Sequence, residues 1–291
     1  MMETGVLIKG IGSFYEVLLH TGETVTCKAR GAFRREGIVP TVGDRVGFER
    51  QASGYAQLCE IEPRKNILVR PPVANIDQLL IVVSASHPEP DWLLVDRLII
   101  AAKRNCIEPI PVLNKIDDGD ESVKEAFLTD YTAFTTILVS AESGEGVDAL
   151  KAQLAGKISC FAGQSAVGKS SLLNRILPEL NLQTGGLSRK TERGRHTTRH
   201  AELWPYLGGA VLDTPGFSLL ETECLEQDEL NACYPEFSDA IPCRFPGCMH
   251  ISEPDCRVKP LLKTGVLSAA RYERYCEIAK EYQIRRKHKY D

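Results

Sequence analysis

The sequence lacks long hydrophobic runs. Nowhere in its 291 residues does an apolar stretch approach the roughly 18 residues of a membrane-spanning helix. The first residues, Met1-Met2-Glu3-Thr4, have neither the basic nor the apolar region of a signal peptide. A large excess of positive charge is also missing, because 35 basic and 39 acidic residues leave a net charge of −4. We therefore expect a cytoplasmic monomer with no membrane contact, in which any contact with nucleic acid depends on local segments.

The ten cysteines do not indicate disulfide bonds, because they are scattered along a chain without an export signal. One group is closely spaced, in the pattern C-x₄-C-x-H-x₅-C: Cys243, Cys248, His250 and Cys256. Three thiolates and one imidazole are the ligand set of a closed tetrahedral zinc site. A loop-rich segment with little core needs such a staple. We predict one structural zinc ion per chain, and we expect Cys224 and Cys233 to be free thiols.

A phosphate-binding loop of the pattern G-x-x-x-x-G-K-[ST] lies in the middle of the chain. Residues 158–162, an apolar run typical of a buried strand, precede it, and residues 170–177 follow with helical periodicity. Lys169 would reach the β- and γ-phosphates, and the Ser170 hydroxyl would bind Mg²⁺. Ala166 would be strained by about 1 kcal/mol if the loop turns left-handed there. The candidate nucleotide-binding residues are Gly163, Gln164, Ser165, Ala166, Val167, Gly168, Lys169, Ser170 and Ser171.

Residues before this loop alternate between predicted strands and helices. The strands are 78–84, 110–113 and 136–139, and the helices are 92–103, 120–129 and 147–154. This alternation favours a parallel sheet covered on both faces, with ligands bound at the carboxyl ends of its strands.

Two segments at predicted strand ends favour guanine as the base. They are Asn114, Lys115, Ile116 and Asp117, in the pattern N-K-x-D, and Ser140 with Ala141. The Asp117 carboxylate would accept from both donors of guanine, N1–H and the exocyclic amine, a pair that adenine lacks. Lys115 would lay its stem across the base, and Asn114 would tie the two loops together. The Ala141 N–H would donate to guanine O6.

The remaining GTPase motifs follow the phosphate loop. Residues 210–212 read as a strand that leads into D-T-P-G, in which Asp213 would hold Mg²⁺ through water and the Gly216 N–H would bind the γ-phosphate. Thr197 and Thr198 are both candidates for the residue that caps the metal, with Thr198 placed among the catalytic candidates. GTPases usually have the phosphate loop first and N-K-x-D late, so this order is a circular permutation, which an open sheet permits.

Phe217 follows D-T-P-G, where a GTPase usually has a glutamine that positions water. A phenyl ring cannot orient water. Either another group does so, with His196 as the candidate catalytic residue, or a partner completes the site and intrinsic hydrolysis is slow. The alternative for His196 is a switch-loop contact or a packing role.

Residues 1–70 show short strand-like runs between glycine turns, at 5–8, 13–19, 23–28 and 44–48. Such runs predict a small closed barrel of the OB type. Phe33, flanked by Arg30, Arg34 and Arg35, combines an aromatic ring for stacking with charge for phosphates. The alternative is a solvated loop of a structural barrel. Residues 66–74, with Pro71-Pro72, are interpreted as a linker.

The C-terminal segment changes its charge. Residues 221–239 contain no lysine or arginine, whereas residues 257–291 have ten basic and four acidic side chains, a difference of 10 − 4 = +6. With interleaved tyrosines this predicts a basic helical tail that contacts RNA phosphates. The alternative is a solvated terminal helix. The basic residues are Arg257, Lys259, Lys263, Arg271, Arg274, Lys280, Arg285, Arg286, Lys287 and Lys289. The segment around the switch threonines adds Arg189, Lys190, Arg193, Arg195 and Arg199.

Taken together, the barrel, the motif order N-K-I-D, S-A, G-Q-S-A-V-G-K-S, G-R-H-T-T, D-T-P-G-F and the zinc pattern resemble the bacterial small-ribosomal-subunit-dependent GTPase A family (RsgA, also called YjeQ). The resemblance covers essentially the whole chain. It implies a multi-domain α/β protein with an OB-like RNA-binding barrel at 1–70, a circularly permuted P-loop GTPase domain at 71–220 and a mostly helical zinc-binding domain at 221–291. Ala166 departs from the glycine usual in the family.

The resemblance also implies an activity and its partners. The family hydrolyses GTP to GDP and phosphate with Mg²⁺, is stimulated by the 30S subunit, and acts in late subunit maturation through 16S rRNA. Residues 114–117 and 163–171 would then bind GTP, the four Cys and His ligands would bind zinc, and the barrel and zinc domain would grip rRNA. Two alternatives are a GTP-sensing RNA-binding module in which hydrolysis is incidental, and a permuted GTPase that serves the large subunit or another RNA.

Overall fold

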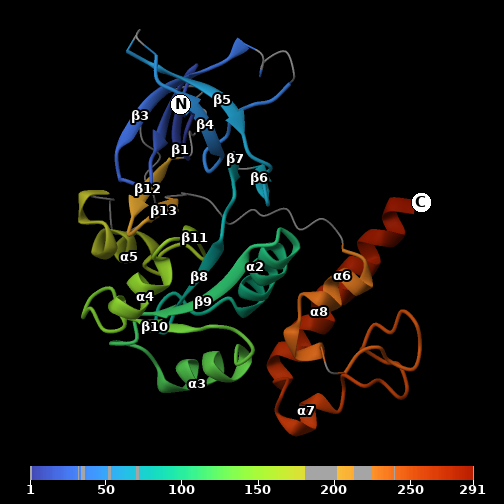
Figure 1. The fold of residues 1–291 in the computed structure, drawn as a ribbon. Helices are drawn as coiled ribbons and strands as arrows, with labels where there is room; N and C mark the ends of the chain where they lie inside the picture. Colours follow the sequence, from blue (N-terminus) through green and yellow to red (C-terminus); the bar gives the residue numbers. More distant parts are fainter. Residues whose placement is uncertain are drawn as a thin grey trace.

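The computed structural model describes residues 2–31, 33, 37–51, 54–69, 72–180, 202–212, 225–238 and 240–290. Figure 1 shows a barrel at the top, a helix-covered sheet below it and a helical lobe at the lower right. Within these ranges no helix has the length and apolar character of a membrane span. Several residues with predicted roles lie outside the described ranges: Arg34, Arg35, Arg189, Lys190, Arg193, Arg195, His196, Thr197, Thr198, Arg199, Asp213, Gly216, Phe217 and Cys224.

The N-terminal strands form a closed barrel in the order β1-β2-β3-β5-β4. They are β1 (Glu3–Ile11), β2 (Phe14–Leu18), β3 (Thr24–Ala29), β4 (Arg45–Glu49) and β5 (Ala56–Ile61). β1 pairs with both β2 and β4, which closes the barrel. In β3 the side chains of Val25 and Cys27 point inward and those of Thr24, Thr26 and Lys28 point outward, the alternation of a sheet with one buried face. The predicted all-β barrel is confirmed.

The predicted linker is wrong as a description of residues 66–74. β6 (Ile67–Val69) and β7 (Pro72–Ala74) pair antiparallel as a hairpin. The physical reason is burial: Leu68 and Val73 face each other across the hairpin and are almost fully buried. A bridge from Val42 to Val73 joins the hairpin to the chain that enters β4. The apolar residues of this hairpin therefore pack between barrel and sheet.

The central sheet has the strand order β10-β9-β8-β11-β13-β12. Its strands are β8 (Gln78–Ser84), β9 (Glu108–Asn114), β10 (Ile137–Val139), β11 (Ile158–Ala162), β12 (Leu203–Tyr206) and β13 (Gly209–Leu212). The first five in this order are parallel, and β12 pairs antiparallel to β13 at the edge. The predicted parallel sheet is confirmed, although the sequence did not predict β12.

Helices cover both faces of the sheet (Figure 1). They are α2 (Trp92–Arg104), α3 (Glu121–Asp130), α4 (Val147–Leu154) and α5 (Lys169–Ile176), which is followed by the 3₁₀ turn η1 (Pro178–Leu180). Every residue of β8 is buried. Leu79 and Ile81 belong to the cluster that contains α2 and α3, whereas Leu80 and Val82 belong to the cluster of α4 and α5. Alternate residues of one strand therefore build two separate cores.

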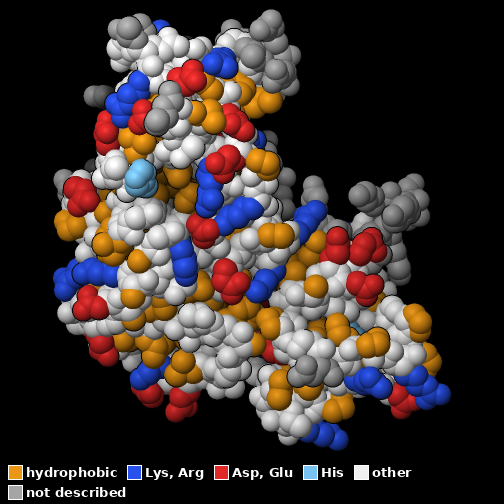
Figure 2. Space-filling model, viewed as in Figure 1, with side chains coloured by type: hydrophobic (Ala, Val, Ile, Leu, Met, Phe, Trp, Pro, Cys, Tyr) orange, Lys and Arg blue, Asp and Glu red, His pale blue; other side chains and the backbone are white. Residues whose placement is uncertain are grey.

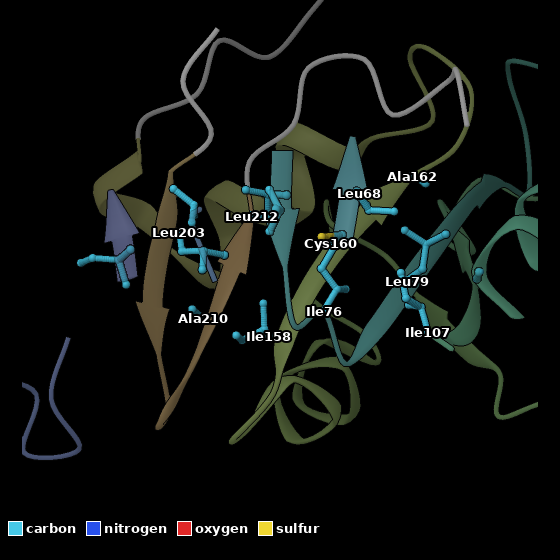
Figure 3. Close-up of a cluster of buried hydrophobic side chains, with 14 of the residues drawn as sticks. Leu68, Ile76, Leu79, Ile107, Ile158, Cys160, Ala162, Leu203, Ala210 and Leu212 are labelled. Carbon is cyan, nitrogen blue, oxygen red and sulfur yellow. The ribbon is translucent and has the colours of Figure 1, made fainter. Parts of the chain in front are cut away.

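One of these cores extends from the sheet into the barrel. It contains barrel residues such as Leu7 and Val17, the hairpin residue Leu68, and the sheet residues Leu79 and Leu212. Figure 3 shows labelled members of this cluster from the edge strand β12 and its neighbour β13 to β8. Barrel and sheet therefore share one apolar core through the β6–β7 hairpin.

The C-terminal lobe is built from short helices against one long helix. Its elements are α6 (Gln227–Ala232), the 3₁₀ turn η2 (Pro235–Phe237), α7 (Leu261–Thr264) and α8 (Ala269–Tyr290). The rings of Tyr234, Phe237 and Tyr275 pack with centroids 4.9 to 5.1 Å apart. Ile100 of α2 belongs to the same cluster. Over the face in Figure 2, basic and acidic side chains are interspersed, in keeping with the small net charge.

Candidate functional site

The phosphate loop runs from the end of β11 to the start of α5 and turns left-handed at three residues. Gly163 has φ 128°, Ala166 has φ 65° and Gly168 has φ 96°. A Cβ on Gly163 would lie 2.1 Å from the Val82 carbonyl oxygen, so no other residue fits there. Ala166 does adopt the left-handed conformation anticipated from the sequence. The strain of about 1 kcal/mol that we assigned to it therefore applies.

Lys169 is the first residue of α5 and is partly buried. Its ammonium donates to the Gly163 carbonyl at 2.8 Å and to the Gln164 carbonyl. Burial lowers the pKa of Lys169. The first intrahelical bond of α5 runs from the Leu172 N–H to the Gly168 carbonyl, so the preceding N–H groups point out of the helix end. Together these donors form a concave site that suits an anion such as a phosphate chain.

Asn114, at the end of β9, connects the phosphate loop to the loop after β10. Its amide Nδ2 donates to the Val167 carbonyl at 2.9 Å, and its Oδ1 accepts from the Ala141 N–H at 3.1 Å. Only 1% of Asn114 is exposed. A Cβ on Gly168 would lie 2.2 Å from Asn114 Nδ2, so the glycine makes room for this amide. The predicted connection between loops is therefore present.

The hydrogen bond between Asn114 and Ala141 uses the N–H group that we had predicted to contact guanine. The Ala141 N–H, predicted to donate to guanine O6, donates to Asn114 in this structure. The amide oxygen of Asn114 reaches it because β9 and β10 are neighbours that end side by side, with Asn114 opposite Val139. Buried Ser140 shapes this loop: its Oγ accepts from the Ser143 N–H at 2.9 Å.

Lys115 and Asp117 differ in how the protein holds them. Lys115 has φ 64° and donates through Nζ to the Ala166 carbonyl at 3.0 Å and to the His87 carbonyl. Its side chain therefore spans the phosphate loop and the end of β8. Asp117 is exposed, and none of the hydrogen bonds or ion pairs found among the described residues engages its carboxylate. It is free to accept two donors from a ligand.

All these residues lie at one edge of the sheet, beyond the carboxyl ends of β8 to β11. β13 ends at the same edge, because Leu212 pairs with Cys160 of β11. The N-terminus of α2 is also here, where the Asp91 N–H donates to the Gln164 side chain at 3.2 Å. Ligands of parallel α/β sheets bind at this edge. The arrangement can hold phosphates on the α5 side and a base between Lys115 and Asp117.

The four predicted zinc ligands lie together in the C-terminal lobe. The ligand atoms of Cys243, Cys248, His250 and Cys256 are all within 4.8 Å of one another. His250 Nδ1 lies 3.5 Å from Sγ of both Cys243 and Cys256, so Nδ1 is the donor atom that faces the thiols. Burial lowers the pKa of His250 and raises that of Cys248 to about 12. A divalent cation would stabilise thiolates here, so the donor set fits a closed metal site.

Three residues hold this loop in shape: Glu253, which the sequence did not single out, and two tyrosines that it had assigned to a contact with RNA. The Glu253 carboxylate accepts from the N–H groups of Met249, Ile251 and Ser252 at 2.8 to 3.0 Å, and these bonds lower the pKa of Glu253. The Tyr272 hydroxyl donates to the His250 carbonyl at 2.6 Å, and the Tyr275 hydroxyl donates to the Met249 carbonyl at 2.9 Å. The sequence signal that could have indicated this role is the position of Glu253 between two predicted metal ligands, His250 and Cys256.

The predicted RNA contact is wrong for Arg271 and Arg274. Arg271 is 1% exposed and bonds Asp96 at 2.5 Å and Glu236 at 2.6 Å. Arg274 bonds Asp96 at 2.5 Å and Asp130 at 2.8 Å. The two arginines are three positions apart on α8, so they share one helix face, and that face packs against α2 and α3. Tyr275 and Tyr282 are buried as well, so the solvated-helix alternative also fails here.

Phe33 does not provide the predicted stacking ring. Only 8% of it is exposed, and it belongs to the barrel core. Its flanking Arg30 lies 3.9 Å from Glu49, a weak surface pair. Cys233 is a free thiol, as predicted, and is buried beneath α2 with its Sγ 3.9 Å from the Ile100 carbonyl.

Two family models and a set of curated relatives match this chain. The family model described as RsgA GTPase matches residues 61–223, and the RsgA N-terminal domain matches residues 4–57. Curated relatives named "Small ribosomal subunit biogenesis GTPase RsgA" include one from Geobacillus sp., 42% identical over 98% of this chain and 99% of the relative. Another, from Caldanaerobacter subterraneus subsp. tengcongensis, is 43% identical over 98% of each.

Two solved structures have the same fold over nearly their whole length. The crystal structure of YjeQ from Thermotoga maritima superposes with a TM-score of 0.84 at 34% identity, over 97% of this chain and 99% of that one. YloQ, described as a circularly permuted GTPase, has a TM-score of 0.83 at 35% identity, over 98% and 96%. The permuted motif order thus belongs to a known arrangement of this sheet.

Proposed function

This chain belongs to the RsgA family of GTPases, and we propose that it couples GTP hydrolysis to late maturation of the small ribosomal subunit in the cytoplasm. Curated relatives carry small-subunit biogenesis in their names. The observation that carries the proposal is the Asn114 bridge, which joins the phosphate loop to the loop after β10. Base-reading and phosphate-binding segments, distant in the chain, thereby form one nucleotide site.

In this proposal Asp117 reads the guanine base and Lys115 supports it. Lys169 and the N–H groups at the start of α5 bind the β- and γ-phosphates, and Ser170 ligates the Mg²⁺ that accompanies GTP. Asp213, Gly216 and one of the switch threonines would contact the metal and the γ-phosphate, and His196 would place the attacking water. These last roles rest on motif position alone.

Asp117→Asn tests the base-reading role. The variant replaces two acceptor positions of a carboxylate by one amide acceptor and one amide donor, so we expect GTP affinity to fall by roughly 100-fold, about 3 kcal/mol. Calorimetric titration of GTP measures this effect. Asp118→Asn is the matched control, because Asp118 is the neighbouring exposed carboxylate. Equal GTP affinity in Asp117→Asn and the wild type would remove base reading from Asp117.

The control of hydrolysis is the second half of the proposal. GTP would order the switch segments so that the barrel and the C-terminal lobe clasp 16S rRNA, and the 30S subunit would complete the site that Phe217 leaves without a water-positioning side chain. Hydrolysis to GDP would then release the protein. We expect purified 30S subunits to raise the steady-state rate of GTP turnover severalfold or more. Equal rates with and without subunits would contradict a partner-completed site.

Phe217 also supports a second candidate function. A protein that lacks the usual glutamine could use GTP only to set its affinity for RNA, with hydrolysis incidental. Lys169→Ala separates the two, because it removes the ammonium that the loop carbonyls hold. Subunit maturation that proceeds with a variant unable to bind GTP would favour the binding module.

Zinc is proposed as the metal of the C-terminal cluster. Cys243, Cys248, His250 and Cys256 would hold it, and when bound it would supply a rigid four-ligand cross-link with no position open to substrate. We further propose three units, at 1–70, 71–220 and 221–291, in a protein that acts as a monomer. Metal analysis of the purified protein tests for zinc, and size-exclusion chromatography with light scattering tests for the monomer.

A further inference from the structure

The barrel exposes two aromatic rings that take no part in its core. Phe14 is 39% exposed and Tyr55 is 46% exposed, whereas Phe33 and Phe48 are buried inside. Their ring centroids lie 5.3 Å apart with the planes tilted by 58°. Phe14 begins β2 directly after the β1–β2 turn, and Tyr55 immediately precedes β5 in the β4–β5 loop. Two loops that are distant in sequence thus place their rings side by side on the outside of the barrel.

A lysine lies against both rings. Lys28 is the cross-strand partner of Phe14 in the β2–β3 ladder. Its Nζ lies 4.8 Å from the centroid of Phe14 and 5.2 Å from that of Tyr55, within the range of cation–π contacts. No carboxylate of the described residues forms an ion pair with Lys28. The ammonium is therefore fixed in position while its charge remains available to an anion.

These three residues occupy the part of the barrel that is best placed to meet nucleic acid. In five-stranded barrels of this type, oligonucleotides lie across strands 2 and 3 and between the β1–β2 and β4–β5 loops. Phe14 is on β2, Lys28 is on β3 and Tyr55 is in the β4–β5 loop. Adjacent solvent-facing rings with a cation match the requirements of a single strand, whose bases stack on aromatics while its phosphates need positive charge. A duplex keeps its bases stacked inside and cannot use the rings.

We propose that Phe14, Tyr55 and Lys28 form a stacking platform for unpaired bases of single-stranded RNA. Each ring receives one base, and Lys28 binds the phosphate of the intervening backbone. The platform deepens the proposed function, since it rests on RNA being the partner of the barrel. The sequence suggested this stacking role for Phe33, but Phe33 is buried in the barrel core and cannot provide it.

Fluorescence anisotropy with the full-length protein tests the platform. The probes are a short fluorescein-labelled oligouridylate and a blunt RNA duplex of the same length, at one fixed salt concentration. We expect Phe14→Ala and Tyr55→Ala each to weaken oligouridylate binding about 5- to 100-fold, because each removes one base–aromatic stack. Tyr55→Phe keeps the ring and should stay within about twofold of the wild type. Leu207→Ala, which removes an exposed apolar side chain 60% accessible on the β12–β13 turn, is the matched control.

Lys28 gives an independent readout through the salt dependence. Lys28→Gln should reduce the slope of log affinity against log salt concentration by about 0.7, the contribution of one single-strand phosphate contact. Lys28→Arg should restore it. Alanine variants that bind oligouridylate as the wild type does, or a wild type that binds the duplex as tightly as the single strand, would overturn the platform.

The platform and the proposed function can fail separately. Thermal unfolding of each variant checks that the barrel remains folded, which we expect because both rings are exposed. If 30S subunits stimulate GTP turnover equally in wild type and Phe14→Ala while oligouridylate affinities are equal too, the platform falls and the proposed function stands. If oligouridylate binding depends on the rings but subunits never stimulate turnover, the platform stands and the proposed function falls.

Discussion

The barrel and the C-terminal lobe are attached to the helix-covered sheet by interfaces of different character. The barrel shares an apolar core with the sheet through the β6–β7 hairpin, including Leu68 and Ile76. The lobe also has an apolar contact with α2 through Ile100, but it adds buried ions, in which Arg271 and Arg274 of α8 meet Asp96 of α2. Apolar contact is non-directional, whereas a buried ion network is stable only in one geometry. The lobe is therefore fixed in orientation by α2, and the barrel is fixed mainly by the fit of its core.

Helix α2 contacts both the phosphate loop and the ionic interface of the lobe. Its N-terminal cap donates from the Asp91 N–H to Gln164 of the phosphate loop, and Asp96 of the same helix holds both arginines of the lobe. The guanidinium of Arg271 also lies over the rings of Tyr131 and Tyr234. One rigid element thus touches the nucleotide site and anchors the lobe. The apolar interface on the barrel side has no such direct connection to the phosphate loop among the described contacts.

The largest expected effect comes from removing the metal of the C-terminal cluster. Structural zinc sites contribute about 10–16 kcal/mol of apparent binding free energy in zinc-finger peptides, so chelation should unfold the loop that contains Cys243 and Cys256. Limited proteolysis with mass spectrometry should then show new cuts in the lobe and none in the barrel. Cys106→Ser, a change at an exposed cysteine away from the cluster, is the control. A metal-free lobe that resists protease as well as the metal-loaded one would contradict this expectation.

Asp96→Ala should cost the next largest amount. It leaves two guanidinium groups buried without their shared carboxylate, and breaking a buried ion network destabilises by about 3–5 kcal/mol. Hydrogen exchange of α8 amides measures the loss locally, because the effect falls on the attachment of the lobe. Asp148→Ala is the matched control. Asp148 pairs with Lys151 while its own side chain is 99% exposed. Its loss should therefore change the free energy of opening measured by hydrogen exchange very little.

This contrast also separates what the sequence could predict from what it could not. The phosphate loop and N-K-x-D are local patterns whose strand and helix context is visible in the chain, so their position at the carboxyl ends of the strands was predicted correctly. Arg271 and Asp96 are 175 positions apart. No periodicity links an arginine to an acid at that distance, and its charge therefore suggested a contact with RNA instead of a buried pair.

Other misses have equally specific causes. A proline pair at 71–72 indicates a turn but cannot tell whether the flanking residues form a linker or a packed hairpin. Phe33 was predicted to be a stacking ring because arginines flank it in the sequence. The direction of a loop side chain depends on the folded barrel, and here it points into the core. Glu253 holds three backbone N–H groups, a role that depends on the folded loop and has no motif.

Ile76→Ala tests the apolar interface and should cost less than Asp96→Ala. Ile76 is fully buried in the shared core, and truncation of such a residue typically destabilises by about 2–4 kcal/mol. We expect faster amide exchange in β6, β7 and the adjoining barrel strands, with α8 unaffected. Ile67→Ala, a neighbour that is 42% exposed, should change little. An equal effect of Ile76→Ala on α8 would show that the two interfaces are not independent.

The smallest effect should come from an exposed ion pair between the barrel strand β1 and the residue before β12. Lys9 bonds Glu202 at 2.7 Å, with both side chains about one-third exposed (29% and 34%). The hydrogen bond to Glu202 raises the pKa of Lys9, so the pair is fully formed at neutral pH and weakens only when alkaline pH approaches that raised value. Water and salt screen such a pair, so Lys9→Gln should cost about 0–1 kcal/mol in a urea unfolding experiment. A loss as large as that of Asp96→Ala would mean that charge, and not burial, sets the strength of these interfaces.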